Sequence, residues 1–227
     1  MKQRSAAILL MVLFLCCSGC VAGKSKYSVA AGGIISMPQA RSSLISYHES
    51  GQYFKDVEIK AASVAEALEK ALAARVKYPA VIMSVEDVLL STYPARKEQG
   101  FSVNKEARKA LESHIILSVL PPVRASLPLF SYLAAKNIPV FLVSNRAEDM
   151  RISVMENLSK VGFSGWRGLY MLPARYPENK NFSEEVRKGL VKSGFNIVAT
   201  VGAVEEDVEG EAAGKAVLYP NYMYEKR

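Results

Sequence analysis

The stretch PAVIMSVEDVLLSTYP, residues 79–94, decides how the rest of the chain is interpreted. A short apolar run, Ala80 to Met83, ends in the polar cluster Ser84-Val85-Glu86-Asp87, and further apolar residues then lead to a Tyr-Pro turn. Buried parallel strands have this continuous apolar character, and α/β folds bind ligands just beyond the carboxyl ends of such strands. The stretch therefore predicts a buried parallel strand with Ser84 and Glu86 at its tip, where a functional site is expected.

Apolar runs and amphipathic stretches alternate along most of the chain. Residues 51–76 predict a long helix, because Val64, Leu68, Leu72 and Val76 recur at helical spacing. Further strands are expected at 139–144, 168–172, 196–201 and 216–219, and further helices at 128–136, 148–161 and 184–192. This alternation predicts an α/β fold, a Rossmann-like three-layer parallel sheet flanked by helices, with an N-terminal helical extension. Residues 94–125 break the alternation and are expected to form a small cap insertion over the strand tips.

The N-terminal segment, residues 1–19, has the layout of a secretory signal. Lys2 and Arg4 precede an apolar run over residues 6–16, which is too short for an ordinary transmembrane span. The small residues that follow resemble a bacterial lipobox, in which Cys20 becomes the lipidated first residue. Cys17 departs from the leucine usual there. We expect residues 20–43 to form a flexible tether and residues 44–227 to form the folded domain.

The resemblance to a lipobox implies a membrane partner, reached through a lipid on Cys20. Residue 21 is Val rather than the Asp that resembles an inner-membrane retention signal, so the expected location is the outer membrane of a bacterial cell envelope. A plain signal peptide cut by another peptidase, which would give a periplasmic or secreted protein, and an uncleaved anchor remain the alternatives.

Cysteine usage and charge exclude several classes of function. All three cysteines, Cys16, Cys17 and Cys20, lie at the N-terminal end, so the domain contains no disulfide, no thiolate metal site and no cysteine nucleophile. The formal net charge is +7, with no run rich in lysine or arginine. That pattern argues against a nucleic-acid partner and remains compatible with phosphorylated small molecules or lipid headgroups.

Five stretches together resemble one family, the haloacid-dehalogenase-like (HAD) acid phosphatases of class B/C type. This family includes bacterial surface lipoproteins and plant vegetative storage proteins. The stretches are residues 47–57, similar to the opening helix, 79–94, similar to the first motif, 141–166, similar to the second, 196–210, similar to the last, and 217–224, similar to the ending. The resemblance covers residues 44–224, nearly the whole expected domain.

The resemblance also implies a mechanism. In the family, an aspartate at the first strand tip attacks phosphorus, and a second aspartate two residues later protonates the leaving oxygen and then activates water. Two residues apart, both side chains leave an extended strand on the same side. A Ser or Thr donates to a phosphate oxygen, a Lys neutralises charge, and aspartates of the last motif hold magnesium.

Carried over to this sequence, most of those charged positions have changed. The nucleophile position is Ser84, the acid/base position is Glu86, the lysine position is Ser183, and the acidic positions of the last motif are Ala203 and Asp207. Ser84 lacks an ionised oxygen, and the magnesium ligands expected at Ser84 and Ala203 are gone. No catalytic set is therefore intact, and we expect neither a magnesium ion nor another cofactor.

Residues Ser144, Asn145 and Arg146 are the candidates for phosphate binding, because they follow the second strand and precede a helix N-terminus. The same hydroxyl and amide would also cap that helix. Lys180 and Lys188 lie near the lysine position but do not align with it.

The sequence favours an acid-phosphatase-like envelope lipoprotein that is not an active enzyme and acts as a binding or scaffold protein. Its partner would be a phosphorylated small molecule or an envelope protein. The alternative is a weak or atypical phosphomonoesterase or 5′-nucleotidase that uses Glu86, Asp207 or an activated water. A third possibility is a structural protein whose former pocket is filled by side chains.

Other polar and aromatic residues have simpler interpretations beside their functional ones. Asp87 is either a displaced nucleophile or, as we expect, a turn or cap residue. The acidic run over residues 205–209 either holds a cation or forms a solvated loop. His48 is expected to pack or cap, and His114 to lie in the irregular insertion. The aromatics that could line a nucleoside pocket, or belong to the core and its rim, are Tyr93, Phe101, Trp166, Tyr170 and Tyr176.

Overall fold

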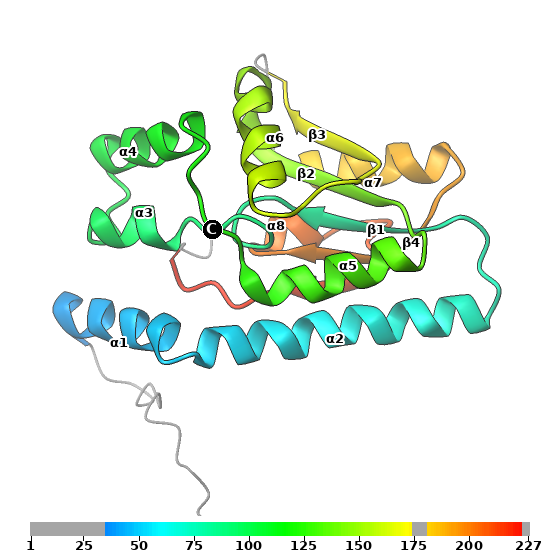
Figure 1. The fold of residues 1–227 in the computed structure, drawn as a ribbon, viewed down its shortest axis with the longest axis horizontal. Coiled ribbons are helices and arrows are strands. Elements are labelled where there is room, and N and C mark those ends of the chain that lie inside the picture. Colours follow the sequence, from blue (N-terminus) through cyan, green and yellow to red (C-terminus); the bar gives the residue numbers. More distant parts are fainter. Residues whose placement is uncertain (1–34, 174–180, 224–227) are drawn as a thin grey trace, which may run out of the picture. The chain divides into compact units, whose positions relative to one another are not determined.

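Five parallel strands form the centre of the fold in the computed structural model, which describes residues 35–173 and 181–223 (Figure 1). The strands are β1 (Pro79–Ser84), β2 (Val140–Ala147), β3 (Gly168–Leu172), β4 (Asn196–Gly202) and β5 (Lys215–Leu218). Their order across the sheet is β3-β2-β1-β4-β5, and every neighbouring pair is parallel. The α/β prediction is therefore confirmed, and the stretch quoted at the outset supplies the central strand.

Strand β1 is buried on both faces, as its continuous apolar character predicts. Val81 and Met83 point into the larger hydrophobic core, whereas Ala80 and Ile82 point into a smaller core on the opposite face. This alternation follows from the two-residue period of a strand. The sheet is consequently covered by helices on both faces.

Four helices supply most of that cover. Helices α2 (Gln52–Ala73), α5 (Leu127–Ala135) and α6 (Arg151–Lys160) pack on the larger core. Helix α7 (Phe182–Lys192) packs on the smaller core through Phe182, Val186 and Leu190, which lie four residues apart on one helix face. The helices predicted at 51–76, 128–136, 148–161 and 184–192 are thus present.

The N-terminal boundary of the fold differs from the prediction. Helix α1 (Met37–Glu49) occupies residues that were assigned to the tether, so that assignment is wrong over residues 37–43. Ser36 and Gln39 form a capping box at its start, and Pro38 stands in its first turn, both strong signals for a helix N-terminus. The expected opening helix over residues 47–57 is also interrupted, because Gly51 adopts φ +82° between α1 and α2.

The insertion over residues 94–125 contains two helices, α3 (Tyr93–Glu98) and α4 (Lys105–Ile116), which lie beside each other in Figure 1. The Asn104 side chain accepts a hydrogen bond from the Ala107 N–H and so caps the start of α4. Short helical turns complete the fold: η1 (Arg124–Ser126), η2 (Glu148–Met150) and α8 (Glu205–Val208).

Among the residues described, no helix combines the length and the apolar character that crossing a bilayer requires.

Candidate functional site

The candidate site lies at the carboxyl edge of the sheet, where β1, β2 and β4 end. In the register of the sheet, Ser84 of β1 pairs with Val143, the residue before Ser144 of β2. Strand β4 ends at Gly202, and α8 follows and carries Asp207. Because parallel strands end at a common edge, the predicted residues Ser84, Ser144 and Asp207 meet there despite their separation in sequence.

Glu86 is held by the phosphate-binding candidates of β2. The Ser144 hydroxyl donates to Glu86 Oε1 at 2.8 Å, and Arg146 Nε lies 3.6 Å from the same oxygen. The Glu86 side chain is only 14% exposed. Burial raises the pKa of the Glu86 carboxyl, while Arg146 and the Ser144 hydrogen bond act against that rise. The carboxyl of Glu86 therefore faces Ser144 and Arg146 rather than open solvent.

Asp207 is buried and surrounded by donors. Its Oδ2 accepts from the backbone N–H groups of Ala203 at 2.9 Å and Val204 at 3.3 Å, and its Oδ1 accepts from Asn145 Nδ2 at 3.3 Å. Ser84 lies beside this carboxyl and favours its ionised form. Burial raises the pKa of Asp207, and these hydrogen bonds oppose the rise. Most of the acceptor capacity of the carboxyl is therefore used within the protein.

Close approach of Asp207 to the sheet depends on Gly202. A Cβ atom at residue 202 would stand 2.3 Å from the Asp207 Cβ and 2.9 Å from Val208 Cγ1. No side chain larger than hydrogen fits there without moving α8. Gly202 is thus a positioning residue that the motif comparison overlooked.

The predicted lysine position shows a second feature that was missed. Ser183 is buried in the first turn of α7, and its hydroxyl has no hydrogen-bond partner among the residues described. One turn later, the fully buried guanidinium of Arg187 donates to the backbone carbonyls of Asp207 at 2.6 Å, Glu211 at 3.1 Å and Glu209. Arg187 therefore links α7 to the backbone of residues 207–211 and does not face the strand tips.

Lys188, which lies near that position, does not take the role of the family lysine. Lys188 forms ion pairs with Glu184 at 2.7 Å and with Glu211 at 3.6 Å, and its side chain is 42% exposed. Lys180 lies outside the described residues, as do Tyr176 and Cys20.

Asp87 serves the turn after β1, as expected. Its carboxylate accepts from the Thr92 N–H at 2.7 Å and from the Thr92 hydroxyl at 2.8 and 2.9 Å, and its backbone adopts φ +56°. Thr92 immediately precedes α3, so Asp87 fixes the start of the insertion. The interpretation of Asp87 as a displaced nucleophile has no support in this geometry.

The two histidines lie away from the strand-tip carboxylates. His48 packs, as predicted, with its ring stacked between Tyr53 at 4.2 Å and Tyr93 at 4.1 Å. His114 lies in α4, so the prediction that its segment is irregular was wrong; its Nδ1 contacts the Ala110 carbonyl oxygen at 2.8 Å.

The other aromatic candidates belong to several packing groups. Tyr93 and Phe101 contact each other in the insertion, with ring centroids 6.0 Å apart. Trp166 packs against the larger core, and Tyr170 against the smaller one. These positions do not form one aromatic pocket.

The residues at the strand tips do not match the magnesium site that the resemblance implies. A hydroxyl stands at Ser84 and a methyl group at Ala203, where hard carboxylate ligands would be needed. The described residues contain no group of three or more His, Cys, Asp or Glu side chains arranged to hold a metal ion. Within the predicted acidic loop, residues Glu205–Val208 form the short helix α8 instead.

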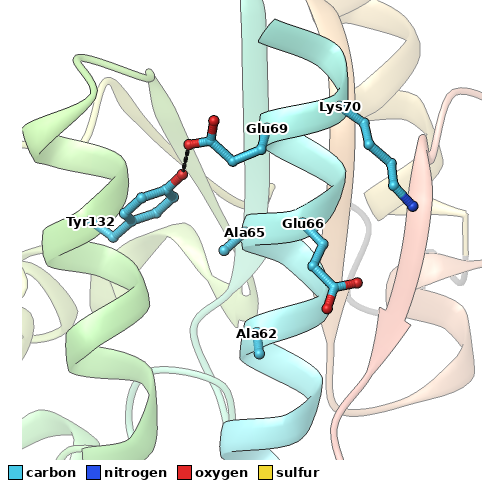
Figure 2. A pocket seen from close by; sticks show the side chains of 6 residues that line it. All are labelled: Ala62, Ala65, Glu66, Glu69, Lys70 and Tyr132. Carbon is cyan, nitrogen blue, oxygen red and sulfur yellow. Dashed lines mark hydrogen bonds between the residues drawn. The ribbon is translucent and has the colours of Figure 1, made fainter. Parts of the chain in front are cut away.

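A surface pocket lies apart from this edge, between α2 and α5 (Figure 2). The Tyr132 hydroxyl donates to Glu69, which also pairs with Lys136 at 2.8 Å. The residues that line the pocket are Ala62, Ala65, Glu66, Glu69, Lys70 and Tyr132. It shares no residue with the strand-tip site.

The parallel sheet, its strand order and the motif residues at its tips define an acid-phosphatase-like α/β protein of HAD type. The chain belongs to the HAD superfamily, subfamily IIIB (acid phosphatase): the sequence model of this family matches residues 22–227. A class C acid phosphatase from Bacillus anthracis has a similar structure, with a TM-score of 0.66 at 18% identity over 83% of this chain and 84% of the other. At that identity the likeness establishes the fold alone.

Plant proteins are similar in sequence. Vegetative storage protein 1 of Arabidopsis thaliana is 28% identical over 145 residues, which cover 63% of this chain and 54% of the relative. Acid phosphatase 1 of Solanum lycopersicum is 26% identical over 147 residues, which cover 63% of this chain and 57% of the relative. The chain thus spans somewhat more than half the length of these relatives.

Proposed function

We propose that this chain is a non-catalytic acid-phosphatase-like protein that has kept the HAD fold for a binding or scaffold role. The observation that carries the proposal is the environment of Ser84. The residue in the nucleophile position is a serine beside the buried Asp207 carboxyl, and that carboxyl already accepts hydrogen bonds from Ala203, Val204 and Asn145. A serine nucleophile needs a free base, and a carboxyl engaged in this way is a poor one.

The charges around the site support the same proposal. Phosphoryl transfer depends on positive groups that neutralise charge as it develops on the transferred phosphoryl group. Ser183 replaces the family lysine, and the nearby Arg187 donates to backbone carbonyls. The chain therefore lacks, at these positions, the cation and the carboxylates that would make magnesium-assisted chemistry efficient. We propose that it binds no magnesium and needs no other cofactor.

The named relatives are compatible with a role outside catalysis. One of them is named as a storage protein and another as an acid phosphatase. For this chain, the proposed partner is a phosphorylated small molecule or an envelope protein, and not nucleic acid.

The proposed location rests on the N-terminal segment that ends at Cys20. Lipidation at Cys20 would attach the protein to the cell envelope, with the outer membrane favoured by Val21. Metabolic labelling with a radioactive fatty acid tests this directly: the label should enter the wild-type chain and be absent from Cys20→Ser. Labelling of both chains, or of neither, would contradict the lipoprotein proposal.

A phosphatase assay tests the proposal of inactivity. The full chain, purified in detergent, is incubated with p-nitrophenyl phosphate or a nucleoside monophosphate, with and without magnesium. We expect no turnover above the buffer blank. Turnover that disappears in Glu86→Ala or Ser144→Ala would refute the proposal, because a contaminating enzyme would not respond to those substitutions.

A second candidate function is a weak phosphomonoesterase or 5′-nucleotidase. One observation favours it: Ser84 lies beside the buried Asp207 carboxyl, whose pKa is raised by burial, and a hydroxyl beside such a carboxyl has the arrangement of a nucleophile with its base. This candidate predicts slow hydrolysis abolished by both Ser84→Ala and Asp207→Asn. Calorimetry that detects magnesium binding would add support to it.

A further inference from the structure

The Glu86 carboxyl occupies a place where two neighbouring donors converge. The Ser144 hydroxyl donates to Glu86 Oε1, and the same hydroxyl accepts from the Arg146 N–H at 3.2 Å. Ser144 is 1% exposed, so its hydroxyl reaches no ligand from solvent while Glu86 stays in place. The partner of the Ser144 hydroxyl is thus an oxygen of the protein itself.

The guanidinium of Arg146 has a hydrogen-bond donor, Nε, that this arrangement leaves unused. Its Nε is buried and makes no hydrogen bond within residues 35–173 and 181–223, and the nearest Glu86 oxygen, at 3.6 Å, is beyond hydrogen-bond length. A guanidinium prefers an oxyanion that it can approach closely and bind with two parallel hydrogen bonds. A hydroxyl and a guanidinium that flank one carboxyl therefore form a donor set larger than that carboxyl uses.

We infer that the Glu86 side chain is an internal ligand of an oxyanion site formed by Ser144 and Arg146. The carboxyl takes the position of a small free oxyanion such as phosphate, so the site is closed in the natural chain and opens when the side chain is removed. This inference rests on the proposed function and favours the envelope protein over the phosphorylated small molecule as partner, because a site filled by Glu86 is closed to phosphate esters.

The length of the side chain at position 86 is central to the inference. Glu86 leaves the loop after β1 and must reach Ser144 at the tip of the neighbouring strand β2. An aspartate lacks one methylene, and its carboxyl would be withdrawn from Ser144. Glu86→Gln would keep the reach and an acceptor oxygen, so the site would stay closed without the negative charge.

Calorimetric titration of inorganic phosphate into the full-length protein tests the inference. We expect Glu86→Ala to bind phosphate with a dissociation constant on the order of millimolar, and the wild type and Glu86→Gln to bind it at least tenfold more weakly. Acetate should also bind Glu86→Ala, because it replaces the missing carboxyl. Adding Ser144→Ala to Glu86→Ala should abolish both interactions, and Glu66→Ala, at an exposed glutamate of α2, should behave as the wild type.

Two results would overturn the inference. One is phosphate binding to the wild type as tight as to Glu86→Ala. The other is a folded Glu86→Ala chain, verified by circular dichroism, that binds neither phosphate nor acetate. If Glu86→Ala does not fold, Glu86→Asp takes its place, with the same expectation of phosphate binding and the same refutation.

Phosphatase turnover, measured in the same samples, separates the two proposals. Turnover by the wild type would refute the proposed inactivity, because a catalytic site must admit phosphate esters. Phosphate binding by the wild type without turnover would refute only the internal ligand.

Discussion

Stacking of His48 between two tyrosines makes the stability of this protein sensitive to acid. The His48 ring lies 4.1 Å from the Tyr93 ring at an interplanar angle of 7° and 4.2 Å from the Tyr53 ring at 24°. Its Nε2 is buried and has no hydrogen-bond partner in the part of the chain that the structure describes. Burial lowers the pKa of His48 from 6.5 to about 4, although Asp87 and Glu49 favour the charged form.

The magnitude follows from linkage between proton binding and folding. A tenfold change in proton affinity corresponds to about 1.4 kcal/mol. A pKa of about 4 in place of 6.5 would amount to about 3 kcal/mol, which partial exposure of the ring reduces to about 2 kcal/mol. Because the folded-state pKa is depressed, this stability is present above pH 6.5 and is lost as the pH falls toward 4.

His48→Phe is the decisive perturbation, because phenylalanine keeps a flat ring between the tyrosines and cannot be protonated. Urea unfolding of both proteins at pH 7.5, 6 and 4.5 measures the free energy of unfolding. We expect the wild type to lose about 1–2 kcal/mol more than His48→Phe between the first and last pH. The comparison cancels the titration of other groups, and His114→Gln should retain the pH dependence of the wild type.

An equal loss in both proteins would refute this reasoning. It would mean that the imidazole is protonated in the folded state without disturbing the stack, so that the ring is much better solvated than its buried Nε2 indicates.

Three further changes test the strand-tip geometry. Gly202→Ala should destabilise the protein by about 1–3 kcal/mol, measured by urea unfolding, because the new methyl group would overlap Asp207. Arg187→Met should cost about 3 kcal/mol or more in the same measurement, because three backbone carbonyls would lose a buried donor. Glu86→Gln should gain stability relative to the wild type as the pH rises from 4 to 8, because the raised pKa of Glu86 makes its ionised form unfavourable in the folded state.

Matched controls sharpen these three tests. Gly189→Ala, on an open face of α7, should be neutral or stabilising by up to about 1 kcal/mol. Lys192→Met, at an exposed cation on the same helix, should change stability by less than about 0.5 kcal/mol. Glu66→Gln should leave the pH profile as in the wild type. If Gly202→Ala or Arg187→Met costs no more than its control, the corresponding contact does not position the last motif.

The sequence was most informative where local patterns and tertiary burial agree. Apolar runs gave β1 and β3 nearly residue by residue. For β1 the reason is its burial on both faces, which leaves little tolerance for polar side chains. Helix α1 was missed because the composition around its start resembles a linker, although Ser36, Pro38 and Gln39 form a start signal there. Those three residues are sufficient to place the boundary correctly.

The residues of the candidate site were predicted, but the contacts between their side chains were not. The resemblance to the family assigned Ser84, Glu86, Ser144 and Asp207 to the site, and the structure places them at or near the carboxyl ends of β1, β2 and β4. The resemblance did not identify Arg187, which lies in an ordinary amphipathic helix and is distinguished only by complete burial. No local pattern reveals that a helix cation will face the backbone carbonyls of a segment remote in the sequence.

The sequence by itself determined the layout of this protein: a parallel sheet flanked by helices, with a buried strand that ends at Ser84. Only the tertiary structure decided the partners of the side chains at the candidate site. The bond from Ser144 to Glu86 joins residues 58 positions apart, and it depends on the register of two strands and on the length of one side chain. The sequence gives the side chain, but local propensity does not fix the register, because register is set by packing of the whole sheet against the helices on its two faces.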